Sequence, residues 1–415
     1  MSQSNPSPGG HTSLLEEYLL ANQPSDSEAS SEEEEDPNAP AEDFTKEGIT
    51  AKRVVLCLSK SIVSLVSSVD GKPLFACTGT VVDHVGSATL ILTSATLVSK
   101  PGIDYEAYGA NEVKIEVLLH NKRTIHGCLA MCNLQYNIAV VTVDSQLDLP
   151  MVTLNDFPDC YSLLVRPVIA VGRDTKYGLL VRHGNMIRKS SKLDCSEILV
   201  CTCPVSKTFI GGLVMDFERR IVGITFWGND TTPIVPVEIA ARCLQHFKCF
   251  RILKQPCLCI RGHALHTMEL SNLGKICYMF PDLCCGMGIV VDKVVTHATP
   301  PLPPPPARCG TDGVENRTRA LLVVVSISGE LSENCGSIQV GDIIHSIDGI
   351  ALHSVAQLTA MLLDAMLVAI RSQNTVTLQA SIRRFRDKSK PVAVLNIHEN
   401  HSVECDKSFN RWRLP

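Results

Sequence analysis

The sequence predicts a mostly β protein, in which two small barrels lie side by side and a smaller unit of mixed α and β structure follows. From about residue 50 to about residue 250, short apolar or β-branched runs recur at roughly ten-residue intervals, divided by Asp-Gly, Gly-Thr and Gly-Ser pairs. Residues 237–250 and 355–367 instead carry apolar residues at helical spacing. A chain of 415 residues, 45% of them hydrophobic, is large enough for two or three domains.

The first folded unit is expected to span residues 47–254 and to consist almost entirely of strands. Roughly 200 residues of this pattern fit two small barrels better than one, and a helix over residues 237–250 closes the unit. The strand candidates are the apolar runs within VVLCLSKSIVSLVSSVDGKPLFACTGTVVDHVGSATLILTSATLV, followed by KIEVLLH, IHGCLAMC, NIAVVTV, LLVRPVIAVG, GLLVRHGNMI, EILVCTC, GGLVMDF and RRIVGITFW.

The second unit is expected to span residues 255–398. Its predicted elements are a helix in SNLGKICYMF, strands in GMGIVVDKVV and LLVVVSI, the segment GSIQVGDIIHSIDG, an amphipathic helix in VAQLTAMLLDAML and a closing strand in NTVTLQASI. A proline-rich insertion, residues 299–318, interrupts the unit and is predicted to be extended or disordered. Residues 399–415 form a tail in which no element is predicted.

Charge is distributed unevenly along the chain. Residues 1–46 hold 11 acidic residues and one lysine, and the stretch SDSEASSEEEEDPNAPAED is predicted to be disordered because it has almost nothing apolar to bury. The remainder is mildly basic without a clustered stripe, so nucleic-acid binding is not predicted. The densest basic run, residues 383–388, is interpreted as a solvated strand end.

Composition also argues against several other classes of protein. No apolar run approaches the roughly 18–20 residues needed to cross a bilayer, and residues 1–20 resemble neither a secretory signal nor a transit peptide. We therefore expect no membrane partner and a cytoplasmic or nuclear location. The 18 cysteines lack the paired spacing of a zinc site, so free thiols are expected, with no metal and no cofactor.

The segment GSIQVGDIIHSIDGIALHSVAQLTAMLL resembles the second half of a PDZ domain of the kind attached to proteases. Residues 340–344 (Val-Gly-Asp-Ile-Ile) and the turn Asp348-Gly349 carry the match. The resemblance implies a PDZ-like α+β domain with a peptide groove beside the helix. Its carboxylate-binding loop is predicted at Gly286, Met287, Gly288 and Ile289, although a plain structural turn explains these residues as well.

The first unit, with this PDZ-like segment behind it, resembles the Do-like (HtrA/Deg-type) trypsin-like serine proteases. LFACTGTVVDHVGSATLILTSATLV is similar to the family's opening segment, QYNIAVVTV to the strand that carries the catalytic aspartate, and TFIGGLVMDFERRIVGI to the nucleophile loop with its following strand. The resemblance implies a trypsin-like double β-barrel followed by a PDZ-like domain, and a serine-type endopeptidase as the family activity.

At the three catalytic positions, however, this sequence departs from the family pattern. The mechanism needs a serine hydroxyl, a histidine base and a carboxylate that orients the histidine. This chain has Thr96 at the histidine position, Asn137 at the aspartate position and Ile210 at the serine position. Gly211 and Gly212 are retained, but Thr208 stands where the oxyanion turn normally has glycine. No catalytic role is left intact.

Other side chains in the neighbourhood leave a relocated site open as an alternative. The candidate hydroxyl, imidazole and thiol groups belong to Ser94, Ser206, Thr208, His120, His126, Cys201 and Cys203. A new triad would need three groups to fall within hydrogen-bond reach of one another. The simpler interpretation is that the hydroxyls belong to turns, the histidines to a polar hairpin and the cysteines to a buried strand.

The leading hypothesis is therefore a non-catalytic Do-like protease homologue, a pseudoprotease that binds peptides, unfolded proteins or partner proteins through its PDZ-like domain and vestigial cleft. The resemblance also implies homo-trimers, or hetero-trimers through which an inactive subunit regulates active relatives. The alternatives are an active serine endopeptidase with a relocated site and a gene product that is losing its function.

Overall fold

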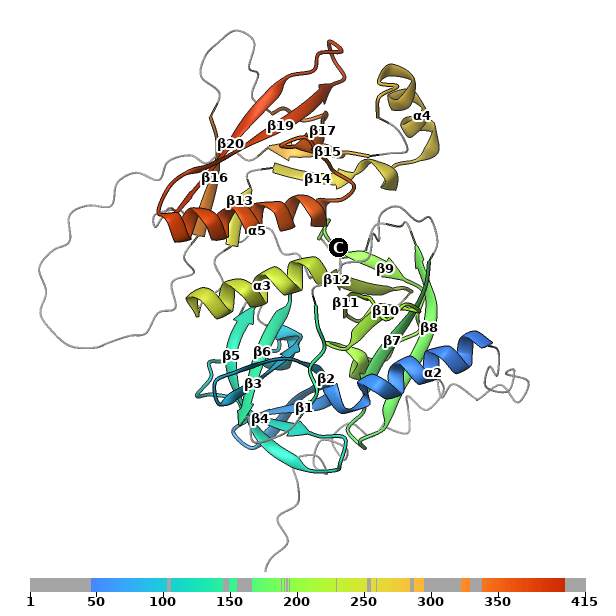
Figure 1. Ribbon diagram of the computed structural model, residues 1–415, viewed down its shortest axis with the longest axis vertical. Coiled ribbons are helices and arrows are strands. Elements are labelled where there is room, and N and C mark those ends of the chain that lie inside the picture. The colour runs from blue at the N-terminus through green and yellow to red at the C-terminus, as the bar shows by residue number, and fades with distance from the viewer. Residues whose placement is uncertain are drawn as a thin grey trace, which may run out of the picture. The chain divides into compact units, whose positions relative to one another are not determined.

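The computed structural model describes residues 46–102, 106–144, 149–154, 166–187, 189, 191, 193, 195–228, 230–251, 255–258, 260–283, 287–294, 322–328 and 338–399 (Figure 1). The predictions of a disordered acidic segment, a proline-rich insertion and a C-terminal tail therefore lie, almost entirely, outside the described residues. The contacts divide the chain into two compact units, and unit 2 contains Arg188–Leu199 and Glu238–Pro415.

Unit 1 contains two closed six-stranded barrels, drawn in blue to cyan and in green in Figure 1. The first barrel has the strand order β1-β2-β3-β6-β5-β4, and its neighbouring strands are antiparallel. At its first hairpin, Asp70 and Gly71 have φ angles of 52° and 78°, the left-handed values that a tight two-residue hairpin requires. Its strands are β1 (Ile62–Val69), β2 (Lys72–Val85), β3 (Ala88–Thr93), β4 (Lys114–Leu118), β5 (Thr124–Asn133) and β6 (Ile138–Asp144).

The second barrel has the order β10-β11-β12-β9-β8-β7. Strand β7 is buried along most of its length, and it pairs with β8 on one side and β10 on the other. The apolar runs predicted as strands from the sequence form the strands of this barrel, and their inward-facing side chains fill its core. Its strands are β7 (Arg166–Arg173), β8 (Leu179–Ile187), β9 (Leu199–Cys201), β10 (Leu213–Asp216), β11 (Ile221–Thr225) and β12 (Thr232–Pro236).

The start of unit 1 differs from the prediction. VVLCL was interpreted as part of a strand, but it lies in helix α2 (Lys46–Leu58). Val54 and Val55 are buried, whereas Leu56 is 66% exposed. A five-residue apolar run does not distinguish a strand from one face of a helix, so its packing decides between them.

Unit 2 contains an eight-stranded sheet with the order β13-β16-β20-β19-β17-β15-β14, in which β18 pairs with β17. Asp348 and Gly349 have φ angles of 48° and 78° and form the predicted tight turn between β17 and β18. The strands are β13 (Gln255–Leu258), β14 (Ile260–Ala264), β15 (Ile289–Val294), β16 (Leu322–Ser328), β17 (Asp342–Ile347), β18 (Ile350–Ala351), β19 (Val376–Arg384) and β20 (Val392–Glu399).

Three helices belong to unit 2: α3 (Val237–Phe250), α4 (Leu270–Met279) and α5 (Val355–Ser372). The Ser354 side chain caps α5 by accepting a hydrogen bond from the Gln357 N–H at 3.0 Å. The α5 helix contacts strands β13, β14, β19 and β20. The Asp364 carboxylate of α5 pairs with the Arg242 guanidinium of α3 at 2.7 Å.

Both strands predicted before and after the proline-rich insertion are present in the sheet of unit 2. The runs GMGIVVDKVV and LLVVVSI both form strands, and β15 lies between β14 and β17 while β16 lies between β13 and β20. No strand was predicted for residues 392–399, which form β20. Helix α5 is long and apolar enough to cross a membrane by composition alone, and 67% of its apolar window is buried inside the protein.

The fold class is confirmed: the protein is mostly β, with a double barrel followed by a further sheet domain. The description of that sheet domain as PDZ-like stays a prediction.

Candidate functional site

The turn after β3 positions Thr96. Strand β3 ends at Thr93, Ser94 is extended, and the short 3-10 helix η3 (Ala95–Val98) follows. The Ser94 Oγ accepts a hydrogen bond from the Thr96 N–H at 3.1 Å, which fixes the start of this helix. Thr96 is half-buried.

Asn137 lies in the turn between β5 and β6, and the structure brings it to Thr96. Its φ of 50° is left-handed, a conformation that asparagine tolerates better than most residues. Its side-chain oxygen Oδ1 accepts hydrogen bonds from the Thr96 N–H at 3.0 Å, the Thr96 hydroxyl at 3.2 Å and the Ser94 hydroxyl at 2.9 Å. The histidine-equivalent and aspartate-equivalent positions are thus in direct contact.

Ile210 ends a second 3-10 helix, η4 (Lys207–Phe209). Its side chain is 3% exposed and packs in the apolar core of the first barrel, together with Leu65 and Leu97. The next residue, Gly211, abuts the turn after β3, because a Cβ placed on it would lie 2.9 Å from the backbone nitrogen of Ser94. The third predicted position therefore adjoins the first two, but it presents an aliphatic side chain to the core.

The backbone around Ile210 is also occupied by internal hydrogen bonds. In a trypsin-like site the nucleophile's own N–H and the N–H two residues earlier hold the oxyanion. Here the Ile210 N–H donates to the Lys207 carbonyl at 3.1 Å, and the Ile210 carbonyl accepts from the Thr78 N–H at 2.8 Å. The Thr208 carbonyl accepts from the Thr78 hydroxyl at 2.7 Å. One of the two expected oxyanion donors is consequently engaged within η4.

The substitute hydroxyls have hydroxyl or side-chain amide partners. The Ser206 and Thr208 hydroxyls lie 2.7 Å apart, and the Ser94 hydroxyl interacts with Thr96 and Asn137. Among the residues that the structure describes, none of these three hydroxyls has a histidine partner.

The substitute histidines lie on the β4–β5 hairpin. His120 follows β4, and its Nδ1 is buried without a hydrogen-bond partner. Burial, and then the charges of Arg173 and Lys60, lower the pKa of His120 below its usual 6.5. His126 is exposed on β5, where it lines a polar hollow with Asp70 and Glu112.

The two candidate thiols are buried in the second barrel. Cys201 is fully buried and Cys203 is 2% exposed. The hydrogen bond between them lowers the pKa of Cys201, and that bond together with burial raises the pKa of Cys203. The Cys203 thiol points to the Val168 carbonyl at 3.8 Å. The interpretation of these cysteines as structural fits this burial.

The predicted carboxylate-binding loop in unit 2 is only partly described, because Gly286 lies outside the described residues. Met287 is half-buried, and Gly288 is buried with a φ of 128°. The Gly288 N–H donates to the Leu352 carbonyl at 2.8 Å, and its own carbonyl accepts from the Leu265 N–H at 2.8 Å. Gly288 therefore has no free amide for a ligand carboxylate.

The sheet order indicates which strand of unit 2 could pair with a peptide. Ile289 begins β15, which is paired on both sides, with β14 and with β17. Strand β14 instead ends the sheet and contacts α5. Sequence reasoning missed Ile260–Ala264 as candidate binding residues, because an edge strand is recognised from its pairing and not from its composition.

Comparisons with known proteins show what the first unit is similar to. Residues 77–224 match the family model of the trypsin-like peptidase domain. These residues run from β2 to β11 and include Thr96, Asn137 and Ile210. In this part of the chain the two closed six-stranded barrels and the family match agree, so it resembles a trypsin-like peptidase domain.

The relationship extends to one branch of these proteins. The chain is 25% identical over 231 residues to "Putative protease Do-like 14" of Arabidopsis thaliana, and the match covers 52% of this chain and 51% of that protein. The chain is similar to this Do-like protease and spans about half of its length. A serine endoprotease from Yersinia pestis, a crystal structure, aligns with a TM-score of 0.42 at 16% identity, over 84% of this chain and 98% of that one.

Proposed function

We propose that the trypsin-like domain of this protein is non-catalytic and that the protein acts by binding. The buried Ile210 is the observation that carries the proposal. Its side chain has no heteroatom, it contributes to the core of the first barrel, and its amide is hydrogen-bonded inside η4. A hydrolytic site needs a nucleophile and free donors at this position.

The contact between Thr96 and Asn137 supports the same proposal. In a working site a carboxylate orients a histidine base and stabilises its charge. Here the corresponding oxygen, Asn137 Oδ1, accepts hydrogen bonds from Ser94 and Thr96. The site has become a structural network that ties the β5–β6 turn to η3.

Binding is proposed for the sheet of unit 2. A peptide in extended conformation adds to the free edge of β14, beside α5, by main-chain hydrogen bonds. Strand β14 is chosen over its neighbour β15 because both edges of β15 are already paired. Assembly as homo-trimers, or as hetero-trimers with active relatives, is part of the same proposal.

The catalytic half is tested with a fluorophosphonate probe and with unfolded casein, using the full chain. We expect no labelling and no cleavage by the unmodified protein. The variant Thr96→His/Asn137→Asp/Ile210→Ser reinstates the family's residues, and Thr96→His/Asn137→Asp is its matched control without a nucleophile. Labelling at position 210 in the triple variant alone would indicate that the scaffold has kept its alignment.

Labelling of the unmodified chain at any residue, or casein fragments that accumulate with it, would overturn the non-catalytic proposal.

The binding half is tested separately with a library of peptides bearing free C-termini. Selected peptides should lose affinity at least tenfold when their C-termini are amidated. A library that returns no ligand would contradict binding by the sheet of unit 2 while leaving the non-catalytic proposal standing.

A further inference from the structure

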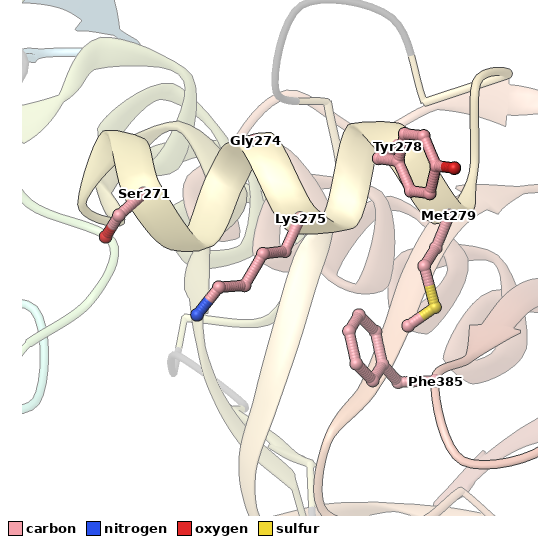
Figure 2. A pocket seen from close by; sticks show the side chains of 6 residues that line it. All are labelled: Ser271, Gly274, Lys275, Tyr278, Met279 and Phe385. Atoms are coloured by element: carbon pink, nitrogen blue, oxygen red, sulfur yellow. The ribbon is translucent and has the colours of Figure 1, made fainter.

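Unit 2 has an open hollow on its surface, away from the β14 edge. The hollow, of about 600 Å³, lies between α4 and the loop that joins β19 to β20 (Figure 2). In the close-up, Met279 at the end of α4 and Phe385 of the loop face the same space. The lining residues are Ser271, Gly274, Lys275, Tyr278, Met279 and Phe385.

Large apolar side chains are exposed around this hollow. Tyr278 is 89% exposed, Leu270 at the start of α4 is 84% exposed, and Phe385 is 39% exposed. Isolated exposed apolar residues are common, but a group of them on one surface marks an interaction site. In an isolated molecule these side chains remain in contact with water.

The core of unit 2 does not require this outer face of α4. The inner face of the helix packs Ile276 against a cluster that contains Phe280, Leu265 and Ile343. Leu270 and Tyr278 do not belong to that cluster. The helix is thus held by one face while the other presents apolar groups to the solvent.

Gly274 provides an independent indication. It lies in the middle of α4, where glycine is less favourable than alanine because it loses more backbone freedom on folding. A Cβ at Gly274 would meet nothing within 4 Å, so packing within this chain does not require glycine there. The glycine leaves the floor of the hollow open to the close approach of another chain.

The charges next to the hollow are basic. The segment from Arg383 to Lys390 holds five basic residues and one acidic residue. Asp282 pairs with Arg383 and Lys390, at 2.7 Å and 3.1 Å, and Asp342 pairs with Arg384 at 2.8 Å.

Three further cations at this surface carry no ion pair among the described residues: Lys275, Arg386 and Lys388. The nearby Asp387 carboxylate accepts a hydrogen bond from the Ser389 N–H, and Glu269 precedes the first turn of α4. An apolar hollow next to unpaired cations complements an acidic segment that carries apolar side chains.

We propose that this hollow is a docking site for an acidic segment of a partner protein, which inserts leucine or aromatic side chains between α4 and Phe385. The acidic groups of that segment pair with Lys275 and Arg386. The site is distinct from the β14 edge, and the proposal holds whether or not the trypsin-like domain is catalytic.

The test selects ligands for the full chain from a random peptide library displayed on phage without free C-termini, so that a C-terminal carboxylate contributes nothing. Counter-selection uses the variant Leu270→Ser/Tyr278→Ser/Phe385→Ser, with its melting temperature measured beside the wild type. Because these side chains are exposed, we expect the variant to fold. Enriched peptides should combine Asp or Glu with Leu or aromatic residues.

Peptides from the selection are then measured by fluorescence anisotropy. Lys275→Glu/Arg386→Glu should weaken binding at least tenfold, whereas Lys52→Glu/Arg53→Glu, the same charge change on exposed residues of α2, should leave it unchanged. Gly274→Ala should raise the melting temperature and still weaken binding. If the triple variant fails to fold, the two charge variants and Gly274→Ala decide the question.

Three results would overturn the proposal. The first is a selection in which no peptide separates the wild type from the variants. The second is enrichment of peptides without acidic residues. The third is a self-association of the wild type, seen by sedimentation, that the variants lose, because it would make the hollow a contact between copies of this chain.

Discussion

Gly211 shows, at the scale of one residue, that packing alone can account for a glycine in the predicted nucleophile loop. Its φ is 80°, and a Cβ there would lie 2.4 Å from the Thr78 carbonyl oxygen and 2.6 Å from the Thr93 hydroxyl. The glycine is therefore required for the loop after η4 to pack against strands β2 and β3. Its presence reflects close packing and does not indicate catalysis.

A matched pair of glycines tests this explanation. Gly71 has almost the same φ, 78°, but a Cβ there would meet nothing within 4 Å. Gly71→Ala should cost about 1 kcal/mol, the price of the left-handed conformation alone. Gly211→Ala should cost at least about 3 kcal/mol, because backbone must also move.

The measurement is the free energy of unfolding of both variants in urea. Equal losses in the two variants would show that backbone conformation, and not the close approach to Thr78, accounts for Gly211.

Asn137 makes a related point about what residue types alone indicate. From the sequence it is a missing carboxylate, and this reading predicts a lost function. In the structure its oxygen accepts three hydrogen bonds, from the Thr96 N–H and from two hydroxyls. The position has a structural role that the substitution itself did not reveal.

At the scale of elements, Arg173 joins parts of unit 1 that are far apart in the sequence. It ends β7, and its guanidinium donates to the carbonyls of Ser59 before β1, Ile62 in β1 and Tyr177 in the β7–β8 turn, at 2.6, 2.7 and 2.7 Å. Its side chain is buried, and among the described residues no carboxylate lies within ion-pair distance of it.

Replacing Arg173 with methionine should therefore destabilise the protein by about 2–4 kcal/mol, because buried carbonyls lose their donors. Arg182→Met, on an exposed part of β8, should change the free energy of unfolding by less than about 0.5 kcal/mol. Urea unfolding measures both. A loss at Arg173 no larger than at Arg182 would contradict this role.

The same substitution should shift His120, because Arg173 is one cause of the lowered pKa of that imidazole. A histidine whose pKa is lower in the folded protein binds protons more readily when unfolded. His120 therefore contributes stability above its unfolded pKa of 6.5, and this contribution is lost as the pH falls through its folded pKa. In Arg173→Met an NMR titration should show a higher pKa for His120 than in the wild type.

At the scale of the whole molecule, burial distinguishes the free cysteines of the described residues from one another. Ten of the cysteines among the described residues are free, and Cys57, Cys128 and Cys249 are exposed. Burial raises the pKa of Cys77 to about 12, partly offset by its hydrogen bond with Thr93, and burial also raises the pKa of Cys243. The thiolate is the reactive form, so burial protects these thiols in two ways.

Alkylation with iodoacetamide near pH 8, read by peptide mass spectrometry, should therefore separate two groups of thiols. The three exposed cysteines should react in the native protein, whereas Cys77 and Cys243 should react only in denaturant. Native-state modification of Cys77 at the rate of Cys57 would contradict the closed packing of the first barrel.

By itself the sequence determined the double barrel, the helices at 237–250 and in the second unit, and the tight Asp-Gly turns, because the period of apolar residues and the turn residues are local signals. The substituted catalytic positions stay a prediction. The sequence did not determine that VVLCL is helical or that β20 exists, since short apolar runs fit either kind of element. Tertiary structure alone decided which groups meet. It placed the Asn137 oxygen on Thr96, buried Ile210 in the core, engaged the Gly288 amide and, among the described strands, left one edge of β14 unpaired. These pairings join residues that no local pattern relates.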